Sequence, residues 1–143
     1  MLRHMLGDDI FKKAVQTYYA TYSGKNAETR DLQQVFEKVS GKNLEQFFRQ
    51  WLYTPGVPRL DMKWKYNASQ QQLQITIRQT QKSVYEFPLE LLIQTPSGKN
   101  QNETIQVNQP EQSFSFSLNQ KPSRIIVDPN VNLLFDGTLS EAK

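Results

Sequence analysis

Hydrophobic residues follow helical spacing in the first part of the chain and strand spacing in the rest. Over residues 8–22 they recur at i, i+1, i+4 and i+5, which is typical of the buried face of an amphipathic helix. Residues 29–40 and 43–52 repeat the helical pattern. Residues 1–6 resemble the last turns of a helix whose beginning is missing. The pattern therefore predicts about three helices plus the end of a truncated one.

From Leu60 onward, hydrophobic and polar residues alternate, which indicates strands with one buried face. The alternation and the turns between the hydrophobic runs predict strands at residues 60–66, 73–78, 84–94, 104–107, 114–118, 125–127 and 131–135. Short strands at this spacing are typical of an antiparallel β-sandwich, here of about seven strands. The predicted fold class is α+β, with a helical segment followed by the sandwich.

Residues 43–60 join the two patterns. A helix containing Trp51 is followed by Pro55-Gly56-Val57-Pro58, where proline removes a hydrogen-bond donor and disfavours helical backbone in the residue before it. We predict that Trp51, Pro55, Gly56 and Pro58 form a structural junction. The corresponding boundaries are residues 1–56 for the helical part, 57–137 for the sandwich and 138–143 for a frayed tail.

The composition narrows the classes of partner. The formal charge is +3, and the lysines and arginines are scattered among acids, so no basic stripe indicates nucleic-acid binding. No apolar run approaches the ~20 residues that span a bilayer. There is no cysteine, which excludes disulfides and cysteine-ligated metals and is compatible with the cytoplasm or a bacterial periplasm. The localisation therefore stays open.

Side chains that carry chemistry are few. His4 is the only histidine, so a two-histidine metal site cannot be assembled from these residues. The acids near helix starts, among them Asp8 and Asp31, are explained by capping and the helix dipole. Glu90 is expected to be solvated on the polar face of a strand. Residues 128–130 are expected to form a turn rather than a cation site, because a single carboxylate falls short of the oxygen ligands that calcium needs.

Several separate pieces of the chain resemble zinc aminopeptidases of the aminopeptidase N type. They are LRHMLGDDIF at residues 2–11, NAETRDL at 26–32, SGKNL at 40–44, FFRQWL at 47–52 and PGVP at 55–58. This match is to the helices at the end of the family's thermolysin-like catalytic domain. Lys121-Pro122, IIVDP at residues 125–129 and Leu133-Leu134 resemble the last strands of the β-sandwich domain that follows in many members.

The resemblance implies a parent enzyme that removes N-terminal residues from peptides, with a zinc-bound water as nucleophile. The family's His-Glu-x-x-His, its later glutamate ligand and its Gly-x-Met-Glu-Asn strand are absent from this sequence. The family's catalytic tyrosine lies upstream of the matched stretch, so Tyr18, Tyr19 and Tyr22 do not inherit its role. We predict no catalytic residue, metal ligand or cofactor within these residues, and the substrate-binding residues stay unassigned.

The first hypothesis is therefore a non-catalytic C-terminal fragment of a zinc aminopeptidase, in which the sandwich is a structural or spacer domain. Its expected partners are the rest of the catalytic domain and, through uncovered helical faces, a second copy of the chain. The alternative is a non-enzymatic module that binds a peptide or another protein through its aromatic helix faces or a sheet edge. The coding sequence upstream of Met1 distinguishes the two hypotheses.

Overall fold

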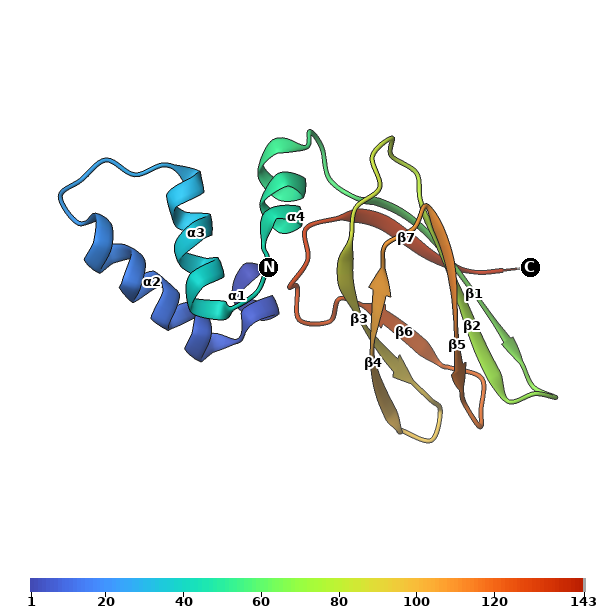
Figure 1. Ribbon diagram of the computed structural model, residues 1–143. Helices are drawn as coiled ribbons and strands as arrows, with labels where there is room; N and C mark the ends of the chain where they lie inside the picture. The colour runs from blue at the N-terminus through green and yellow to red at the C-terminus, as the bar shows by residue number, and fades with distance from the viewer. Residues whose placement is uncertain (143) are drawn as a thin grey trace. The chain divides into compact units, whose positions relative to one another are not determined.

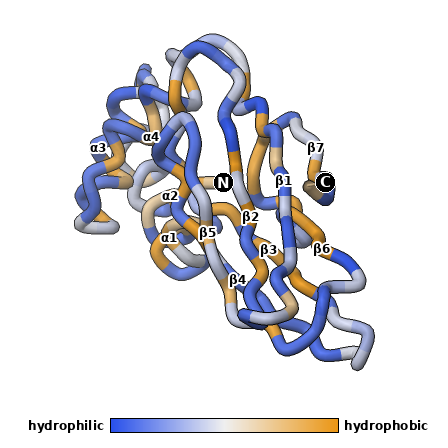
Figure 2. The backbone as a smooth tube through the Cα atoms, turned by 90° about the vertical axis from the view of Figure 1, so that its right-hand side faces the viewer, coloured by the Kyte–Doolittle hydropathy of each residue, from blue (hydrophilic) through white to orange (hydrophobic). Residues whose placement is uncertain are grey.

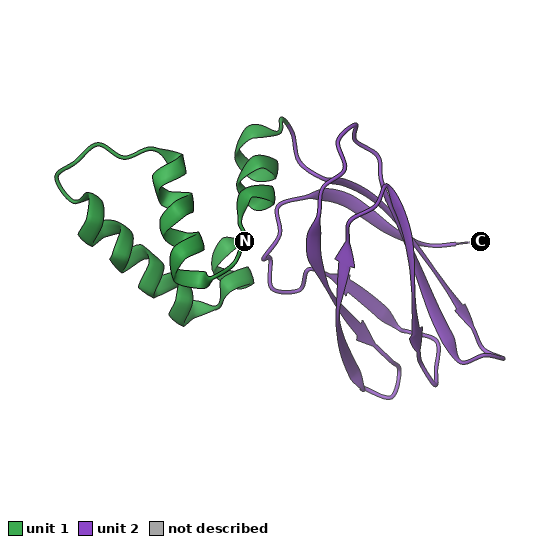
Figure 3. Ribbon diagram, in the orientation of Figure 1, with its two compact units in different colours: residues 1–55 green, residues 56–143 purple. Residues whose placement is uncertain are grey.

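The computed structural model describes residues 1–142, and the chain divides into two compact units between Pro55 and Gly56 (Figure 3). The first unit is helical, and the second consists of strands (Figure 1). The predicted α+β class is confirmed. Lys143, which belongs to the predicted tail, lies outside the described residues.

The helical unit is built around one small core. Its elements are α1 (Leu2–Leu6), α2 (Asp8–Tyr22), α3 (Thr29–Ser40), α4 (Glu45–Phe48) and η1 (Arg49–Tyr53), a turn of π-helix that continues α4. The buried members of the core are Leu6, Ala14, Phe36, Leu44 and Phe48. Phe11 of α2 packs edge-on against Phe36 of α3, with 5.4 Å between ring centroids. This geometry is favourable for aromatic pairs, so it holds the two helices together.

Polar side chains define the helix ends. Glu28 caps α3 in a reciprocal capping box, and its N–H donates to Asp31 Oδ2 at 2.8 Å. Before α4, Asn43 Oδ1 accepts from the N–H of Glu45 at 2.9 Å. The predicted helix over residues 43–52 thus starts as α4 and widens into η1.

The described residues of the second unit, 56–142, form seven strands in two sheets. They are β1 (Arg59–Asn67), β2 (Gln72–Gln79), β3 (Phe87–Gln94), β4 (Asn100–Val107), β5 (Glu111–Ser117), β6 (Arg124–Val127) and β7 (Asp136–Glu141). One sheet has the order β5-β2-β1-β7 and the other the order β4-β3-β6. Every neighbouring pair is antiparallel except β1 and β7, which run parallel. The sandwich is therefore not purely antiparallel.

Alternation of side chains builds the core of the β unit. The buried inner positions are Leu60 and Met62 on β1, Leu73, Ile75 and Ile77 on β2, Phe87, Leu89, Leu91 and Ile93 on β3, and Ile105 and Val107 on β4. The same alternation appears as changes of colour along these strands in Figure 2. Trp64 and Tyr66 continue the inward register of β1 but are only half-buried. Lys121 Nζ lies 5.5 Å from the centroid of the Trp64 ring.

The last strand differs from the sequence-based expectation. Residues 131–135, predicted as a strand, form a loop, and the strand β7 covers residues 136–141, most of which were predicted as a tail. Almost all side chains of β7 are exposed, so no alternation marks it in the sequence. Its pairing with β1 is made by the backbone: Asp136 N–H donates to Pro58 O at 2.9 Å, and Ala142 N–H donates to Trp64 O at 2.8 Å. Strand pairing through backbone groups needs no hydrophobic pattern.

Candidate functional site

The predicted junction residues lie in two different units. Trp51 is in η1, half-buried, with its ring centroid 6.4 Å from that of Phe47. Pro55 is the last residue of the helical unit. Gly56, the first residue of the β unit, has φ +93°, a left-handed conformation that glycine adopts without steric cost. Their role as a structural junction remains a prediction.

Hydrogen bonds hold the first residues of the β unit in place. The Gly56 carbonyl accepts from the hydroxyl of Tyr85 at 3.2 Å, and the Tyr85 side chain is buried. Pro58 is fully buried, and its carbonyl accepts from Asp136 N–H. The N–H of Arg59 donates to Gln81 Oε1 at 2.8 Å. The chain therefore enters β1 along a path fixed by residues far away in the sequence.

Gln79 lies at the centre of this arrangement. Its side chain is only 6% exposed, because it occupies the last inward position of β2 after Leu73, Ile75 and Ile77. Its Nε2 donates to the carbonyls of Tyr85 at 2.8 Å and Gln109 at 3.1 Å. Its Oε1 accepts from Tyr85 N–H at 2.9 Å and from Gln81 Nε2 at 2.6 Å. The amide thus satisfies backbone groups of two loops, as burial of polar groups requires.

Gln79 was not identified in the sequence. The only signal was its register, because a polar residue that follows three inward hydrophobic residues at spacing two must point inward as well. No motif marks such a residue, and its partners Tyr85 and Gln109 become neighbours only after the strands pair.

The acids near helix starts have structural partners. Arg3 forms two bonds to Asp8, from Nε to Oδ1 at 2.8 Å and from its second terminal nitrogen to Oδ2 at 2.9 Å. The hydrogen bonds and the positive charge of Arg3 lower the pKa of Asp8. The same hydrogen bonds and the negative charge of Asp8 raise the pKa of Arg3. The pKa of the Tyr22 hydroxyl is raised, mainly by partial burial and secondly by the hydrogen bond and negative charge of Asp31. Both Arg3 and Asp8 are exposed, so the pair contributes little to stability.

Two acids of the β unit organise a loop. Asp128 is buried in a left-handed backbone conformation, and its carboxylate accepts from the N–H groups of Asn132 and Leu133, both at 2.9 Å. The predicted turn at residues 128–130 is confirmed. Glu90 was expected to be merely solvated, but its Oε2 accepts from the amides of Asn130 at 3.0 Å and Asn132 at 3.3 Å. Glu90 was misread because the asparagines lie about forty positions later in the chain.

The described residues do not fit a zinc centre. A peptidase zinc site needs three protein ligands that converge on one point. His4, the one histidine, is exposed on α1. Within residues 1–142, no three His, Asp or Glu side chains are grouped closely enough to hold a metal ion. We therefore assign no catalytic step to a metal held by these residues. Nor does any helix in this part of the chain have the length and apolar character to cross a membrane.

The comparisons with known proteins agree in pointing to aminopeptidases. Residues 1–51 match the Peptidase family M1 domain. Over 133 residues the chain is 28% identical to aminopeptidase N of Escherichia coli (strain K12). This alignment covers 81% of this chain and 15% of that protein. Aminopeptidase N of Lactococcus lactis subsp. lactis is 38% identical over 58 residues, covering 41% of this chain and 7% of that protein. The resemblance to aminopeptidases of this type is confirmed.

A solved structure shows the same fold over almost the whole chain. It is the crystal structure of Legionella pneumophila aminopeptidase A in complex with aspartic acid, with a TM-score of 0.82 and 19% identity. The match covers 98% of this chain and 17% of that chain. The chain therefore spans only a small share of the length of each of these three relatives.

The Gln79 network can be tested by one substitution. We expect Gln79→Leu to lower the free energy of unfolding by several kcal/mol, because each buried backbone group that loses its partner costs roughly 1–3 kcal/mol. Gln72→Leu is the matched control, since Gln72 lies on the same strand but is exposed. Urea unfolding measures both variants. Equal, small effects of the two substitutions would show that the network does not hold the loops.

Proposed function

We propose that the chain supplies the last helices of the catalytic domain and the following β-sandwich domain of a zinc-dependent aminopeptidase. In this proposal the parent enzyme removes N-terminal residues from peptides, and its zinc ligands lie outside these residues. The observation that carries the proposal is how much of the chain is covered by the Peptidase family M1 match and by the structural match to the Legionella pneumophila aminopeptidase. The M1 match ends at residue 51, within the helical unit that ends at Pro55, whereas the likeness in fold covers 98% of the chain.

The division into two units supports a separate role for each. Residues 1–51 of the helical unit match the Peptidase family M1 domain, and the unit has a small core of its own, so in this proposal it completes the end of the catalytic domain. The β unit has a continuous core formed by the alternating residues of its strands. We assign it a structural or spacer role, with Trp51, Pro55, Gly56 and Pro58 as the junction between the two domains. The buried acid Asp128 is occupied with loop N–H groups rather than directed at a substrate.

Activity of the parent tests this proposal. We expect the coding sequence upstream of Met1 to contain His-Glu-x-x-His, and the protein made from that longer sequence to hydrolyse an aminoacyl chromogenic substrate. The 143-residue chain, assayed in parallel, is expected to release no product. Chelator-sensitive hydrolysis by the 143-residue chain, or an upstream sequence without the zinc motif, would contradict the proposal.

We also infer that the chain alone associates with a second copy through α2. Val15 and Tyr19 stand four positions apart on this helix, and 43% and 72% of their surfaces are exposed. Residues at this spacing share one face, so they form an apolar stripe. A single core in a unit below ~70–80 residues supplies no more than ~3–5 kcal/mol, which favours covering such a stripe.

Sedimentation velocity at increasing concentration measures this association. The unmodified chain is expected to form dimers, and Val15→Lys with Tyr19→Lys is expected to shift it toward the monomer. Gln16→Lys adds a charge to the same helix at an exposed position between the two and is the control. A monomer at every concentration, or equal dimerisation of all three proteins, would be inconsistent with the inferred interface.

A further inference from the structure

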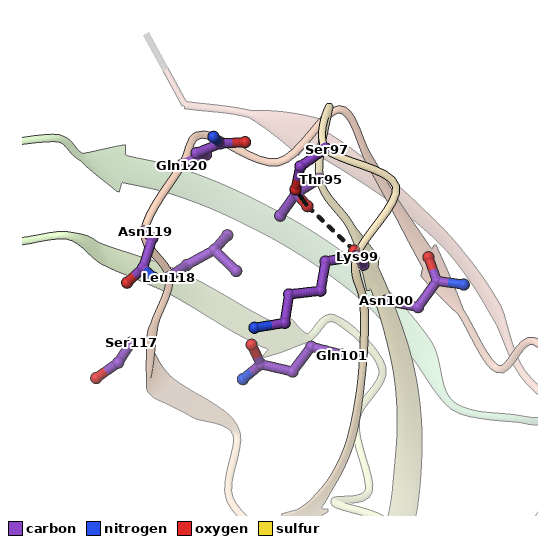
Figure 4. Close-up of a pocket in the computed structure, with 9 residues that line it drawn as sticks. All are labelled: Thr95, Ser97, Lys99, Asn100, Gln101, Ser117, Leu118, Asn119 and Gln120. Carbon is purple, nitrogen blue, oxygen red and sulfur yellow. Dashed lines mark hydrogen bonds between the residues drawn. The ribbon is translucent and has the colours of Figure 1, made fainter.

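One end of the β unit contains a polar cavity that the proposed function does not use. It has a volume of about 380 Å³ and lies between the segment that joins β3 to β4 and the segment that follows β5 (Figure 4). Pockets for small ligands start at about 300 Å³. Nine residues within 1–142 line it, of which eight are polar and Leu118 is hydrophobic.

Hydrogen bonds fix both walls of this cavity. On one side, Thr95 N–H donates to Lys99 O at 3.1 Å, and the Thr95 hydroxyl donates to the same carbonyl at 3.1 Å. On the other side, the N–H of buried Leu118 donates to Gln71 O at 2.8 Å, and its carbonyl accepts from the Tyr66 hydroxyl at 2.7 Å. Walls that are already ordered reduce the conformational entropy that a ligand loses on binding.

The side chains that meet in the cavity keep unused hydrogen-bonding capacity. Lys99 and Gln101 extend toward Ser117, Leu118 and Asn119 across the hollow (Figure 4). Within residues 1–142, the side chains of Lys99, Asn119 and Gln120 form no hydrogen bond or ion pair with another protein group. Lysine offers three N–H donors, and each amide offers donors and acceptors together.

The charge of the cavity lining indicates whether it suits a singly or a doubly charged anion. Among residues 1–142, Lys99 is the single charged residue that lines it, so this part of the lining carries one positive charge. Glu103 lies just behind, because Gln101 Nε2 donates to Glu103 Oε1 at 2.8 Å. A doubly charged phosphate is normally held by arginine forks or by several backbone N–H groups. One ammonium beside neutral amides, with an acid nearby, matches a singly charged anion better.

We propose that this cavity binds a small hydroxylated carboxylate of the sugar-acid class. The carboxylate pairs with the Lys99 ammonium, and the hydroxyl groups exchange hydrogen bonds with the amides of Asn119 and Gln120. Leu118 forms an apolar floor for the carbon chain. The assignment is independent of the peptidase proposal, because the cavity lies wholly within the β unit.

Two-dimensional amide NMR spectra of the 143-residue chain, titrated with D-gluconate, test the proposal. Shifts are expected to concentrate at Lys99, Gln101, Asn119 and Gln120 and to saturate. D-Sorbitol, the uncharged polyol of the same length, and acetate, the carboxylate without hydroxyl groups, are the matched probes. Both are expected to bind at least tenfold more weakly than gluconate.

A pair of lysine variants separates a specific site from general attraction to anions. Lys99→Gln is expected to weaken gluconate binding at least tenfold, whereas Lys82→Gln, at an exposed lysine between β2 and β3, leaves it unchanged. Both positions are exposed, so thermal unfolding of the two variants should match that of the unmodified chain. Absence of saturable shifts, equal binding of sorbitol or acetate, or equal loss in both variants would overturn the proposal.

Discussion

The β unit depends on the central position of β1 between β2 and β7. On one side β1 pairs antiparallel with β2 from Leu60 to Asn67, and on the other it pairs parallel with β7 from Arg59 to Trp64. The β7 pairing brings Gly137 so close to Leu60 that a Cβ at that position would lie 2.7 Å from the Leu60 carbonyl oxygen. Because the register of β1 decides which side chains point inward, this double pairing also places the Gln79 network.

The sequence predicted the parts of the fold that hydrophobic burial decides. The strands β1, β2 and β3 follow their hydrophobic spacing, since each buries one face. The α2 helix forms where its spacing predicts, but of its predicted inward residues Ala14 is buried whereas Val15 and Tyr19 are exposed. Where backbone hydrogen bonds decide, the pattern failed. It did not mark β7, which has almost no buried side chain, and it predicted a strand at the mostly hydrophobic residues 131–135, which form a loop. The turn at Asp128 was predictable because Asp-Pro-Asn is local turn chemistry.

The site-level features were harder to predict because they join distant segments. The Glu90 carboxylate meets Asn130 and Asn132, and the polar cavity joins Lys99 to Asn119, in each case only after strands pair. The family resemblance, in contrast, rested on contiguous residues of the helical unit, and the match to residues 1–51 confirmed it. The sequence therefore predicted the resemblance to aminopeptidases better than it predicted the contacts between distant side chains.

The central proposal is that these residues are part of a zinc aminopeptidase whose metal centre lies elsewhere in the parent. The most direct measurement is the zinc content of the purified 143-residue chain after equilibration with zinc and removal of the unbound metal. The account predicts far less than one zinc ion per chain, because its single histidine and separated acids do not provide three convergent ligands. Stoichiometric zinc that survives dialysis would contradict it.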